Sequence, residues 1–554
     1  MRYRLRDTML GIGLGIGLTL CLCLVFESIS AEAAEGVVFF DANGNGVLDT
    51  GESGVEGVAV SDGVRITWTD DEGIFELSLS DTANFVFVCT PSTGQASTNW
   101  YIPVASDARY DFPLKLISAD GPLVFAQLSD LHYAPNPEEF KLGLRDRRMQ
   151  ILPDPVLEAI VEDVNTSGVD FVILAGDIVA DAQYPEPDLV GQWMQAAAAS
   201  LSTGIDSPVY SVVGNHDVVR DETIGKAIYE ATFGPRYYSF DRKGIHCVVL
   251  DTQQLTGTSL TYTIDAQQLR WLEQDLSRLS SQTPILVFCH EPTFDWADTP
   301  ENQALFTLLQ EVGILALLNG HWHTNVILRE EPFLEITSGA VCGSWWEGPG
   351  PDNTGFGFRV FQVSRGNLDS TWRTGGVDDA EVSEPSRAVL TWMDQLQASV
   401  WGQASQAVYR WDDGAAASVN VNWNGLWSSI ATNLNVSTMV DGYHKLAVEF
   451  MMTDGRTIEE TQSYYVMNPS VSLGEIFSHE DTYQGKVVAA PMLEVRAVMG
   501  ADISAFDETK TIIISKVPSG LARNDMIGII GLYHPTSTAP IKIYDSAFFT
   551  LWPE

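Results

Sequence analysis

The chain has 554 residues, more than one hydrophobic core usually supports, so we expect roughly two to four domains. Hydrophobic residues make up 45% and aromatic residues 10%, which is typical of a folded chain and not of a disordered one. The formal net charge of −42 would repel phosphate backbones, so no duplex nucleic acid is expected as a partner.

Residues 1–33 have the pattern of a secretory signal peptide. A basic start precedes the apolar stretch 9–26, and small residues at Ala31 and Ala33 suit a signal peptidase. We therefore expect an exported protein: periplasmic, secreted or on the cell surface. The apolar stretch is also long enough to stay as an uncleaved membrane anchor, and this alternative is open.

Segment 34–118 is expected to be a β-sandwich domain, because short strand-like runs alternate with Gly and Asp turns. Its first loop, 41–52, has the spacing of an EF-hand calcium loop, with Gly46 at the sixth position. A strand-like run precedes it, so it resembles the calcium loops of bacterial surface β-sandwich repeats and not a helix-loop-helix. A solvated turn in a very acidic protein is the alternative. The candidate calcium ligands are Asp41, Asn43, Asn45, Asp49 and Glu52.

Segment 119–375 contains five short, continuously apolar runs, which are typical of strands covered on both faces. Each run is followed by residues that bind metals, and α/β sheets place their sites beyond the carboxyl ends of such strands. We therefore predict one pocket built from five strand ends. The runs and the residues that follow are 123–126 with Asp130-Leu131-His132, 171–175 with Gly176-Asp177, 209–213 with Gly214-Asn215-His216-Asp217, 285–288 with Cys289-His290, and 314–318 with Gly320-His321-Trp322-His323.

The distribution of histidines supports this pocket, since five of the nine in the chain lie in these clusters. Cys289 adjoins a candidate ligand, but adjacent strand residues point to opposite faces, so we expect its side chain in the core. The cysteines beyond the signal are too few and dispersed for a disulfide framework. Leucines with helical spacing predict a helix after Asp265, packed on the sheet: Leu269, Leu272, Leu276 and Leu279.

The rest of the chain is expected to be mostly β. A stretch rich in Gly, Asp, Glu and Ser, 376–390, is predicted to be a linker. Strand patterning in 391–468, clearest at 443–450, predicts an immunoglobulin-like domain. Segment 469–554 is expected to be an OB-like β domain, with strands at 487–498, 511–515, 526–533 and 541–551.

The ordered set Asp-x-His, Gly-Asp, Gly-Asn-His-Asp, His and Gly-His-x-His, over residues 123–323, resembles the calcineurin-like metallophosphoesterase family. The stretches 233–235, 237–240 and 342–346 resemble an exported bacterial subgroup that carries an extra β domain on each side of the catalytic domain. The resemblance implies an α/β catalytic domain, a calcineurin-like β-sandwich flanked by helices, with all-β domains on both sides.

The resemblance also implies a binuclear metal centre. Asp130, His132 and His323 would hold the first ion, and Asp177 would bridge to the second. Asp, His and Asn side chains without thiolates suit Mn²⁺, Fe or Zn²⁺. Ala180 stands where purple acid phosphatases carry a tyrosine, which argues against an Fe(III)–tyrosinate site. The ligands that would complete the second ion are Asn215, His290 and His321.

The implied activity is hydrolysis of a phosphomonoester or phosphodiester by attack of a metal-bound hydroxide on phosphorus. His216 is not needed as a ligand, so we expect it to protonate the leaving group or stabilise the phosphoryl group. Asp217 is expected to orient His216 by a hydrogen bond, with turn capping as its alternative role.

The sequence indicates the substrate less clearly than it indicates the metal ligands. Tyr133, Trp345 and Trp346 could line the pocket or pack in the core, and Arg236 could contact a phosphate or be solvated. The first function is therefore an exported binuclear-metal phosphoesterase acting on a small phosphate ester. The alternative is a surface glycan or cell-wall binding protein with a vestigial metallophosphoesterase domain. The complete set of ligands argues against the second, because a relic should have lost some of them.

Overall fold

The computed structural model describes residues 33–105, 109–133, 154–182, 187–346, 348–350, 354–375, 380–383, 388–390, 395–434, 439–440, 442–467, 487–499, 502–506, 511–515, 526–533 and 541–551. All but the last residue of the expected signal peptide lie outside this part. Among the described residues, none of the helices is long and apolar enough to span a membrane.

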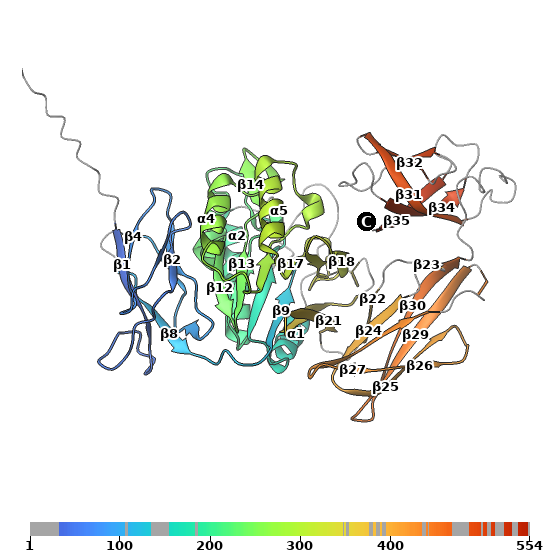
Figure 1. Ribbon diagram of the computed structural model, residues 1–554, viewed down its shortest axis with the longest axis horizontal. Coiled ribbons are helices and arrows are strands. Elements are labelled where there is room, and N and C mark those ends of the chain that lie inside the picture. The colour runs from blue at the N-terminus through green and yellow to red at the C-terminus, as the bar shows by residue number, and fades with distance from the viewer. Residues whose placement is uncertain are drawn as a thin grey trace, which may run out of the picture.

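The N-terminal domain consists of two four-stranded sheets (Figure 1). Alternation of exposed and buried side chains in β4 shows that one face of the sheet is packed and the other solvated. Val38, Val60 and Phe75 are among the buried residues between the sheets. One sheet has the order β4-β1-β8-β6, with β1 (Ala33–Phe40), β4 (Ile74–Ser78), β6 (Gly94–Ala96) and β8 (Phe112–Leu116). The other has the order β3-β2-β5-β7, with β2 (Ala59–Ser61), β3 (Ile66–Trp68), β5 (Phe85–Val88) and β7 (Tyr101–Pro103).

The catalytic segment is a sandwich of two sheets, and the five predicted runs are divided between them. The first sheet has the order β11-β10-β9-β20-β21, with β9 (Leu123–Leu128), β10 (Phe171–Ala175), β11 (Val209–Val212), β20 (Gly357–Ser364) and β21 (Asn367–Thr374). The second has the order β12-β13-β16-β17-β19-β18, with β12 (Tyr238–Arg242), β13 (Ile245–Val249), β16 (Ile285–Phe288), β17 (Ala316–Asn319), β18 (Val326–Arg329) and β19 (Leu334–Thr337). A separate hairpin is formed by β14 (Gln253–Thr256) and β15 (Ser259–Tyr262).

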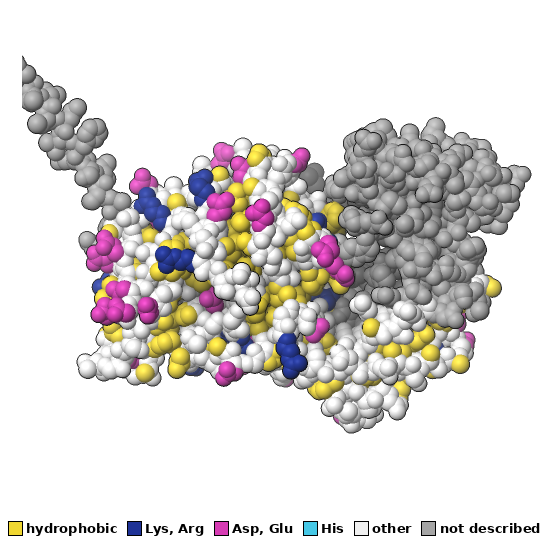
Figure 2. All heavy atoms as spheres, in the orientation of Figure 1, with side chains coloured by type: hydrophobic (Ala, Val, Ile, Leu, Met, Phe, Trp, Pro, Cys, Tyr) yellow, Lys and Arg dark blue, Asp and Glu magenta, His cyan; other side chains and the backbone are white. Residues whose placement is uncertain are grey.

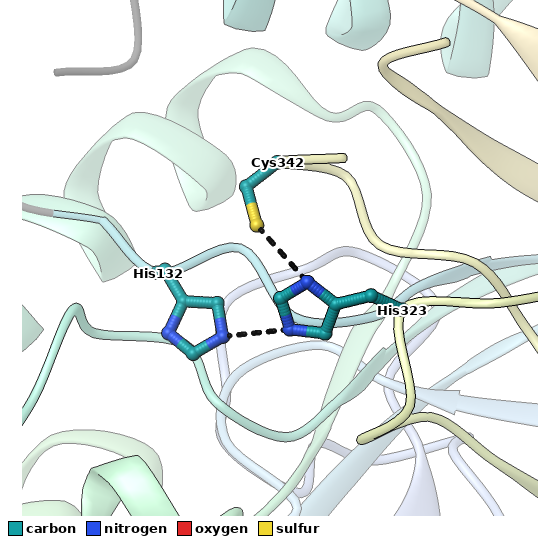
Figure 3. Close-up of side chains that lie close together, drawn as sticks. All are labelled: His132, His323 and Cys342. Atoms are coloured by element: carbon teal, nitrogen blue, oxygen red, sulfur yellow. Dashed lines mark hydrogen bonds between the residues drawn. The ribbon is translucent and has the colours of Figure 1, made fainter. Parts of the chain in front are cut away.

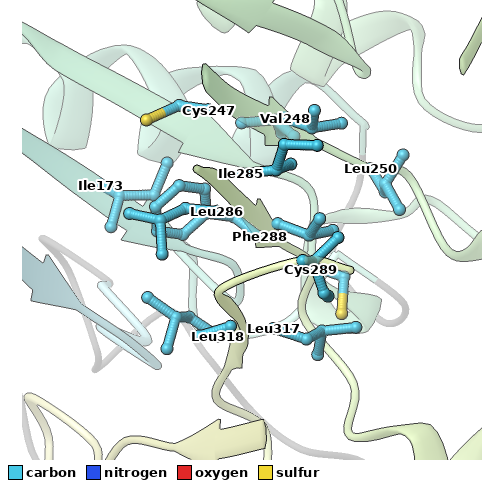
Figure 4. Close-up of a cluster of buried hydrophobic side chains, with 14 of the residues drawn as sticks. Ile173, Cys247, Val248, Leu250, Ile285, Leu286, Phe288, Cys289, Leu317 and Leu318 are labelled. Atoms are coloured by element: carbon cyan, nitrogen blue, oxygen red, sulfur yellow. The ribbon is translucent and has the colours of Figure 1, made fainter. Parts of the chain in front are cut away.

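Both sheets contain parallel neighbours, so several strands end at the same edge. β9, β10 and β11 pair in parallel in one sheet, and β13, β16 and β17 pair in parallel in the other. Between the sheets, Phe125 stacks with Phe171 and Phe361, each at a ring-centroid distance of 4.9 Å. Figure 4 shows part of this core, in which Phe288, Leu317 and Cys289 lie together. The prediction that Cys289 is a core residue is confirmed, since none of its surface is exposed.

Helices cover the outer faces of the sandwich. Buried Trp193 and Ile160 belong to the core on the first sheet, and buried Leu305 and Leu309 extend the core of the second. The predicted helix after Asp265 is confirmed: Asp265 caps it by accepting from the Gln268 N–H, and the helix ends before Leu279. The helices are α1 (Asp154–Thr166), α2 (Pro187–Gly204), α3 (Ala227–Phe233), α4 (Ala266–Leu276) and α5 (Pro300–Val312), with single 3₁₀ turns η2 (Asn215–Asp217) and η3 (Thr293–Asp295).

The next domain has the strand order of an immunoglobulin sandwich. Its sheets have the orders β22-β24-β28-β27 and β23-β30-β29-β25-β26, which correspond to the ABED and GFC sheets with β23 paired in parallel to the last strand. The prediction of a linker at 376–390 was wrong in part, because β22 and β23 supply the first strand of each sheet. The strands are β22 (Ala380–Ser383), β23 (Ala388–Leu390), β24 (Gln395–Trp401), β25 (Ala404–Trp411), β26 (Ala417–Val419), β27 (Asn422–Trp423), β28 (Trp427–Asn433), β29 (Gly442–Met452) and β30 (Thr457–Met467).

The last domain is a five-stranded antiparallel sheet in the order β33-β32-β31-β34-β35. An OB barrel has this order and closes by pairing its third and fifth strands. That closing pair is not found among the described residues, so the barrel stays a prediction. The strands are β31 (Val487–Met499), β32 (Asp502–Phe506), β33 (Thr511–Ser515), β34 (Met526–Tyr533) and β35 (Ile541–Leu551).

Candidate metal centre

The seven predicted ligands meet at one end of the sandwich, where strands of both sheets terminate. Asp130 and His132 follow β9, Asp177 follows β10, and Asn215 opens the 3₁₀ turn after β11. The opposite sheet contributes three histidines from the loops after β16 and β17: His290, His321 and His323.

Four of these side chains surround a first point. His132 Nε2 lies 3.2 Å from His323 Nε2, 3.7 Å from Asp177 Oδ2 and 3.9 Å from Asp130 Oδ1. His323 Nε2 is 3.5 Å from Asp130 Oδ1. Ligand atoms that share one ion at about 2.0–2.2 Å lie about 3–4 Å apart, so the spacing fits a divalent ion.

A second point lies on the other side of Asp177. His290 Nε2 is 3.1 Å from Asp177 Oδ2, and Asp177, His290 and His321 each present a ligand atom to one another. Asp177 therefore belongs to two groups of possible metal ligands, one with His132 and His216 and one with His290 and His321.

Unpartnered atoms give an independent test of whether these residues fit metal ions. Four buried ligand atoms lack any hydrogen-bond partner within the described structure: Asp130 Oδ1, Asn215 Oδ1, His290 Nε2 and His321 Nδ1. A buried polar atom without a partner costs about 1–3 kcal/mol. A bound cation would remove this cost for all four, so the residues present fit the group.

Backbone carbonyls fix which nitrogen each histidine offers. His290 Nδ1 donates to Ala175 O at 2.7 Å, and His323 Nδ1 donates to Gly343 O at 2.8 Å. A carbonyl can only accept, so the proton is on Nδ1 and the lone pair of Nε2 faces the centre. His132 has the same arrangement, with a longer contact of 3.4 Å to Ala180 O. Burial, reinforced by the neighbouring His216, lowers the pKa of His132 to about 3, which keeps it in the neutral, ligating form.

The carboxylates are oriented in the same way. Asp130 Oδ2 accepts from Ser129 Oγ at 2.5 Å and from the His321 N–H at 3.0 Å, which leaves Oδ1 to face the centre. Asp177 Oδ1 accepts from the His216 N–H at 2.7 Å, which leaves Oδ2. Burial opposes ionisation of Asp130, but His323 and His290 together outweigh burial and lower the pKa of Asp130 to about 2. Sequence analysis missed Ser129; its only signal was a hydroxyl next to a ligand.

The backbone around the ligands is unusual. Five ligands have left-handed conformations, with φ of 53° at Asp130, 44° at His132, 51° at Asp177, 69° at His321 and 55° at His323. Such conformations are uncommon for non-glycine residues and concentrate at functional sites.

The glycines of the motifs allow the loops to approach closely. A Cβ on Gly214 would lie 2.1 Å from the Asp177 N atom, and one on Gly320 would lie 1.7 Å from Ser129 Oγ. Neither position can hold a side chain unless the neighbouring ligand loop moves.

Cys342 lies beside the centre without facing it. Its Sγ is 3.9 Å from His323 Nδ1, whereas His323 Nε2 points toward His132 (Figure 3). The thiol therefore contacts the nitrogen that is turned away from the proposed ion, and burial raises its pKa. The other cysteines in the described part of the chain, Cys89, Cys247 and Cys289, are also free thiols.

The expected role of Asp217 in orienting His216 was wrong. Asp217 Oδ1 accepts from the Ile178 and Val179 N–H groups at 2.9 and 3.1 Å, and Oδ2 accepts from the Gly214 N–H at 2.9 Å. The loop after β10 thus engages Oδ1, and the loop after β11 engages Oδ2. Burial, with the charge of Asp177, raises its pKa to about 7.

His216 is oriented by other groups. Its Nδ1 donates to Ala180 O at 3.0 Å and lies 3.7 Å from Asp181 Oδ1. The ring lines a cavity of about 220 Å³ beside the ligands. This cavity is lined by Asp177, His216, His321, Trp322, His323, Ser344 and Trp345.

Of the three predicted aromatic residues, only Trp345 lines this cavity. Its ring is 4.1 Å from that of His132 and 5.1 Å from that of His216. Trp346 and Tyr133 are buried, with 4% and 8% of their surfaces exposed. Sequence analysis overlooked Trp322, although it stands between two ligands.

Arg236 is not free to meet a phosphate. Its guanidinium pairs with Glu230 Oε1 at 2.7 Å and with Asp251 Oδ2 at 2.5 Å. Burial opposes the charge of Arg236, but these carboxylates outweigh burial and raise its pKa.

The predicted calcium loop follows β1, as expected. Asp41 Oδ1 accepts from the Gly44 N–H at 2.7 Å, and Asp49 Oδ2 accepts from Asn43 and Asn45 at 2.8 and 2.7 Å. Glu52 Oε1 accepts from the Ala42 N–H at 2.8 Å and closes the loop. The side chains of Asn43 and Asn45 thus meet Asp49, whereas Asp41 and Glu52 accept from the backbone of the loop, and calcium binding stays a prediction.

Comparison with known proteins agrees with this geometry. Residues 123–325 match the family model for calcineurin-like phosphoesterases, and residues 42–115 match the model for the N-terminal domain of these proteins. The chain belongs to the calcineurin-like phosphoesterase family. Its membership accounts for the order of the metal-binding motifs along the catalytic domain.

Curated relatives include the serine/threonine-protein phosphatase CPPED1 of Bos taurus, 30% identical over 172 residues, and that of Mus musculus, 29% identical over 175 residues. These matches cover 28% of this chain and span about half the length of the relatives, 53% and 54%.

A dimetal phosphatase from Danio rerio is a similar solved structure, with 19% identity and a TM-score of 0.33 over 46% of this chain and 100% of that one. Likeness at this level carries no functional argument.

Proposed function

We propose that the protein is an exported phosphoesterase that holds two divalent metal ions and hydrolyses a phosphomonoester or phosphodiester. One observation carries the proposal: two groups of possible ligands share Asp177, and four buried atoms of the expected ligands have no partner in the described structure. The name of the curated relatives, serine/threonine-protein phosphatase, supports phosphoserine and phosphothreonine among the substrates to be tried.

When bound, two ions would activate a water molecule and neutralise charge that develops on the phosphoryl oxygens. Asp130, His132, Asp177 and His323 would hold one ion, and Asp177, Asn215, His290 and His321 the other. His216 lines the cavity with its Nδ1–H donating to Ala180 O, so Nε2 is the nitrogen left for the leaving oxygen, and it would donate a proton there from the imidazolium form.

The test is to strip the protein of metal, reload it with Mn²⁺, and measure cleavage of p-nitrophenyl phosphate and bis-p-nitrophenyl phosphate. Asn215→Ala should lose metal and turnover together. His216→Ala should keep its metal and lose about 10²–10⁴-fold in rate. If the wild type, fully loaded, cleaves neither ester nor any phosphopeptide, the proposal is wrong.

Export is supported by the pattern of residues 1–33. Amino-terminal sequencing of the protein from the extracellular or periplasmic fraction tests it, and a chain that stays in the cytosol with residue 1 intact would contradict it. Glycan binding by the β domains is a separate prediction. Glycan-array binding that survives Asn215→Ala and His216→Ala would support it.

A further inference from the structure

Another group of possible metal ligands lies between the N-terminal and catalytic domains. Cys89, Asp241 and His246 each present one ligand atom, and these three atoms all lie within 4.8 Å of one another. Thiolate, carboxylate and imidazole are three kinds of ligand that bind Zn²⁺ in proteins. The group is at the opposite end of the sandwich from the binuclear centre, because His246 pairs with Ile285 at the start of β16, and the other end of this strand leads to His290.

The backbone of two domains holds the three residues in place. Cys89 directly follows β5 of the N-terminal domain, and its N–H donates to Ala59 O at 2.9 Å. Asp241 and His246 lie directly opposite each other on the antiparallel strands β12 and β13 of the catalytic domain. The Asp241 N–H donates to Thr90 O at 2.8 Å, which fixes the segment after β5 against β12. The three side chains therefore meet because the two domains are in contact here.

His246 is oriented as a metal-binding histidine would be. Its Nε2 lies 2.9 Å from Asp275 Oδ2, and Asp275 Oδ1 accepts from Ser239 Oγ at 2.9 Å. A carboxylate that accepts from one ring nitrogen turns the other nitrogen toward a metal ion. The other nitrogen, Nδ1, lies 2.7 Å from Asp241 Oδ1. Atoms that bind one ion at about 2.0–2.1 Å lie about 3 Å apart, so the two atoms need to separate by only about 0.3 Å.

A divalent ion would replace two protons at this place. Without an ion, His246 bridges the two carboxylates as an imidazolium, and burial raises the pKa of the Cys89 thiol, which stays protonated. Binding of the ion releases the Nδ1 proton and the thiol proton, so the total charge of the group is unchanged. The Asp241 side chain is 35% exposed, which gives the ion access from solvent and leaves room for water as a fourth ligand.

The surface of the molecule favours the arrival of cations. The formal net charge is −42, and acidic side chains are spread over the face of the N-terminal and catalytic domains in Figure 2. Such a surface raises the local concentration of divalent cations around the molecule. Exposed carboxylates alone do not select an ion, whereas a thiolate prefers Zn²⁺ to harder ions such as Mn²⁺.

We infer that Cys89, Asp241 and His246 bind a Zn²⁺ ion that cross-links the N-terminal domain to the catalytic domain. The ion takes one ligand from the first domain and two from the second, and Asp275 is a positioning residue that acts through His246. The inference is independent of the proposed function, because none of these residues lines the cavity beside the binuclear centre.

The first experiment measures Co²⁺ binding, because Co²⁺ substitutes for Zn²⁺ and a cobalt–thiolate bond gives an intense charge-transfer band in the near ultraviolet. Metal-free wild type, Cys89→Ser and Cys342→Ser are each titrated with Co²⁺. Cys342→Ser is the matched control, because Cys342 is the thiol beside the binuclear centre. Wild type and Cys342→Ser should show the band, and Cys89→Ser should not. Zn²⁺ added afterwards should displace Co²⁺ and abolish the band, which gives the affinity for Zn²⁺.

The inference is overturned if the wild type shows no thiolate band, or if the band survives in Cys89→Ser. Asp275→Asn should keep the band and weaken Zn²⁺ binding by about 10- to 100-fold, the usual effect of removing a carboxylate that orients a ligand. Glu273→Gln, at an exposed position on the same helix α4, should bind Zn²⁺ as the wild type does. Equal Zn²⁺ affinity in these two variants would contradict the role of Asp275.

Limited proteolysis tests the cross-link between the domains. Zn²⁺ should slow the release of the N-terminal domain from the wild type and should have no such effect on Cys89→Ser. An equal effect on both proteins would show that Zn²⁺ acts elsewhere and would contradict the cross-link.

Two other outcomes remain decisive. If circular dichroism shows that Cys89→Ser does not fold, Asp241→Asn replaces it. Zn²⁺ binding that is weaker by about 10-fold or more supports the site, and binding within about 3-fold of wild type contradicts it. If the wild type cleaves no phosphate ester, the proposed function fails, but the thiolate band and the proteolysis still decide whether this site binds Zn²⁺.

Discussion

The Asp217 carboxylate binds backbone N–H groups instead of orienting the neighbouring His216. Its two oxygens accept from three buried N–H groups of the loops that carry Asp177 and Asn215. In Asp217→Asn, an amide group would replace Oδ2 opposite the Gly214 N–H. The free energy of unfolding should fall by about 1–3 kcal/mol, measured by urea denaturation. The folded, metal-loaded variant should keep the dependence of activity on pH that the wild type has. A changed dependence would show that Asp217 does orient His216.

His246, which is not one of the expected ligands of the binuclear centre, bridges two carboxylates. Its Nδ1 lies 2.7 Å from Asp241 Oδ1 and its Nε2 lies 2.9 Å from Asp275 Oδ2. Burial alone would lower the pKa of His246, but the two carboxylates outweigh it and raise the pKa well above 6.5.

The raised pKa of His246 predicts a pH-dependent contribution to stability. Because the folded-state pKa exceeds the unfolded one, the stabilisation is complete below about pH 6.5 and is lost as pH rises through the folded pKa. Thermal unfolding of wild type and His246→Gln, both kept free of metal by a chelator, should therefore differ most at about pH 5.5 and converge in alkaline buffer. A difference that grows with pH would contradict this assignment.

At the scale of elements, the strand-to-loop junctions are the positions that tolerate substitution least. Gly214→Ala would place a methyl group 2.1 Å from the Asp177 N atom. We expect lost metal binding and a stability loss of about 1–3 kcal/mol, the usual cost of overpacking. Gly191→Ala in α2 is the control, because its new Cβ would lie 3.7 Å from Ile228. It should be neutral or stabilising by up to about 1 kcal/mol. Equal metal content in both variants would show that the close approach at Gly214 is unimportant.

Five strands of the catalytic domain could be predicted because buried parallel strands are continuously apolar and these five end in a ligand cluster. The division of these strands between two facing sheets could not be predicted, because β9 and β16 have the same continuously apolar pattern. β22 and β23 were missed because short edge strands with Gly, Asp, Glu and Ser around them resemble a linker. Asp217 was misassigned because its partners are set by the path of the loop after β10.

At the scale of the whole molecule, the N-terminal domain is joined to the catalytic domain through specific side chains. Trp271 of α4 donates from Nε1 to Ser61 Oγ at 3.1 Å, and its ring lies 6.4 Å from that of Phe87. Tyr237 donates to Gly63 O at 2.6 Å. The immunoglobulin-like domain contacts the opposite side, where Arg373 stacks over Trp401 at 4.4 Å (Figure 1).

Trp271→Ala tests this junction. The side chain is 1% exposed, so its removal should lower the free energy of unfolding by about 3–5 kcal/mol and make the N-terminal domain more sensitive to limited proteolysis. Trp423→Ala, at a position 39% exposed in β27, should change stability by less than about 0.5 kcal/mol. Unchanged proteolysis in Trp271→Ala would mean that the two domains do not depend on this contact.

The carbonyl groups of Ala175 and Gly343 set the tautomers of His290 and His323 without any help from an ion. If the ions bind as proposed, one ion could replace another within these preoriented ligands without refolding of the chain. A cage of nitrogen and oxygen donors ranks first-row ions by their intrinsic affinities, with Mn²⁺ the weakest. The ions bound by this chain would therefore follow the metals that its surroundings supply, and the same chain in two compartments could be two different metalloproteins.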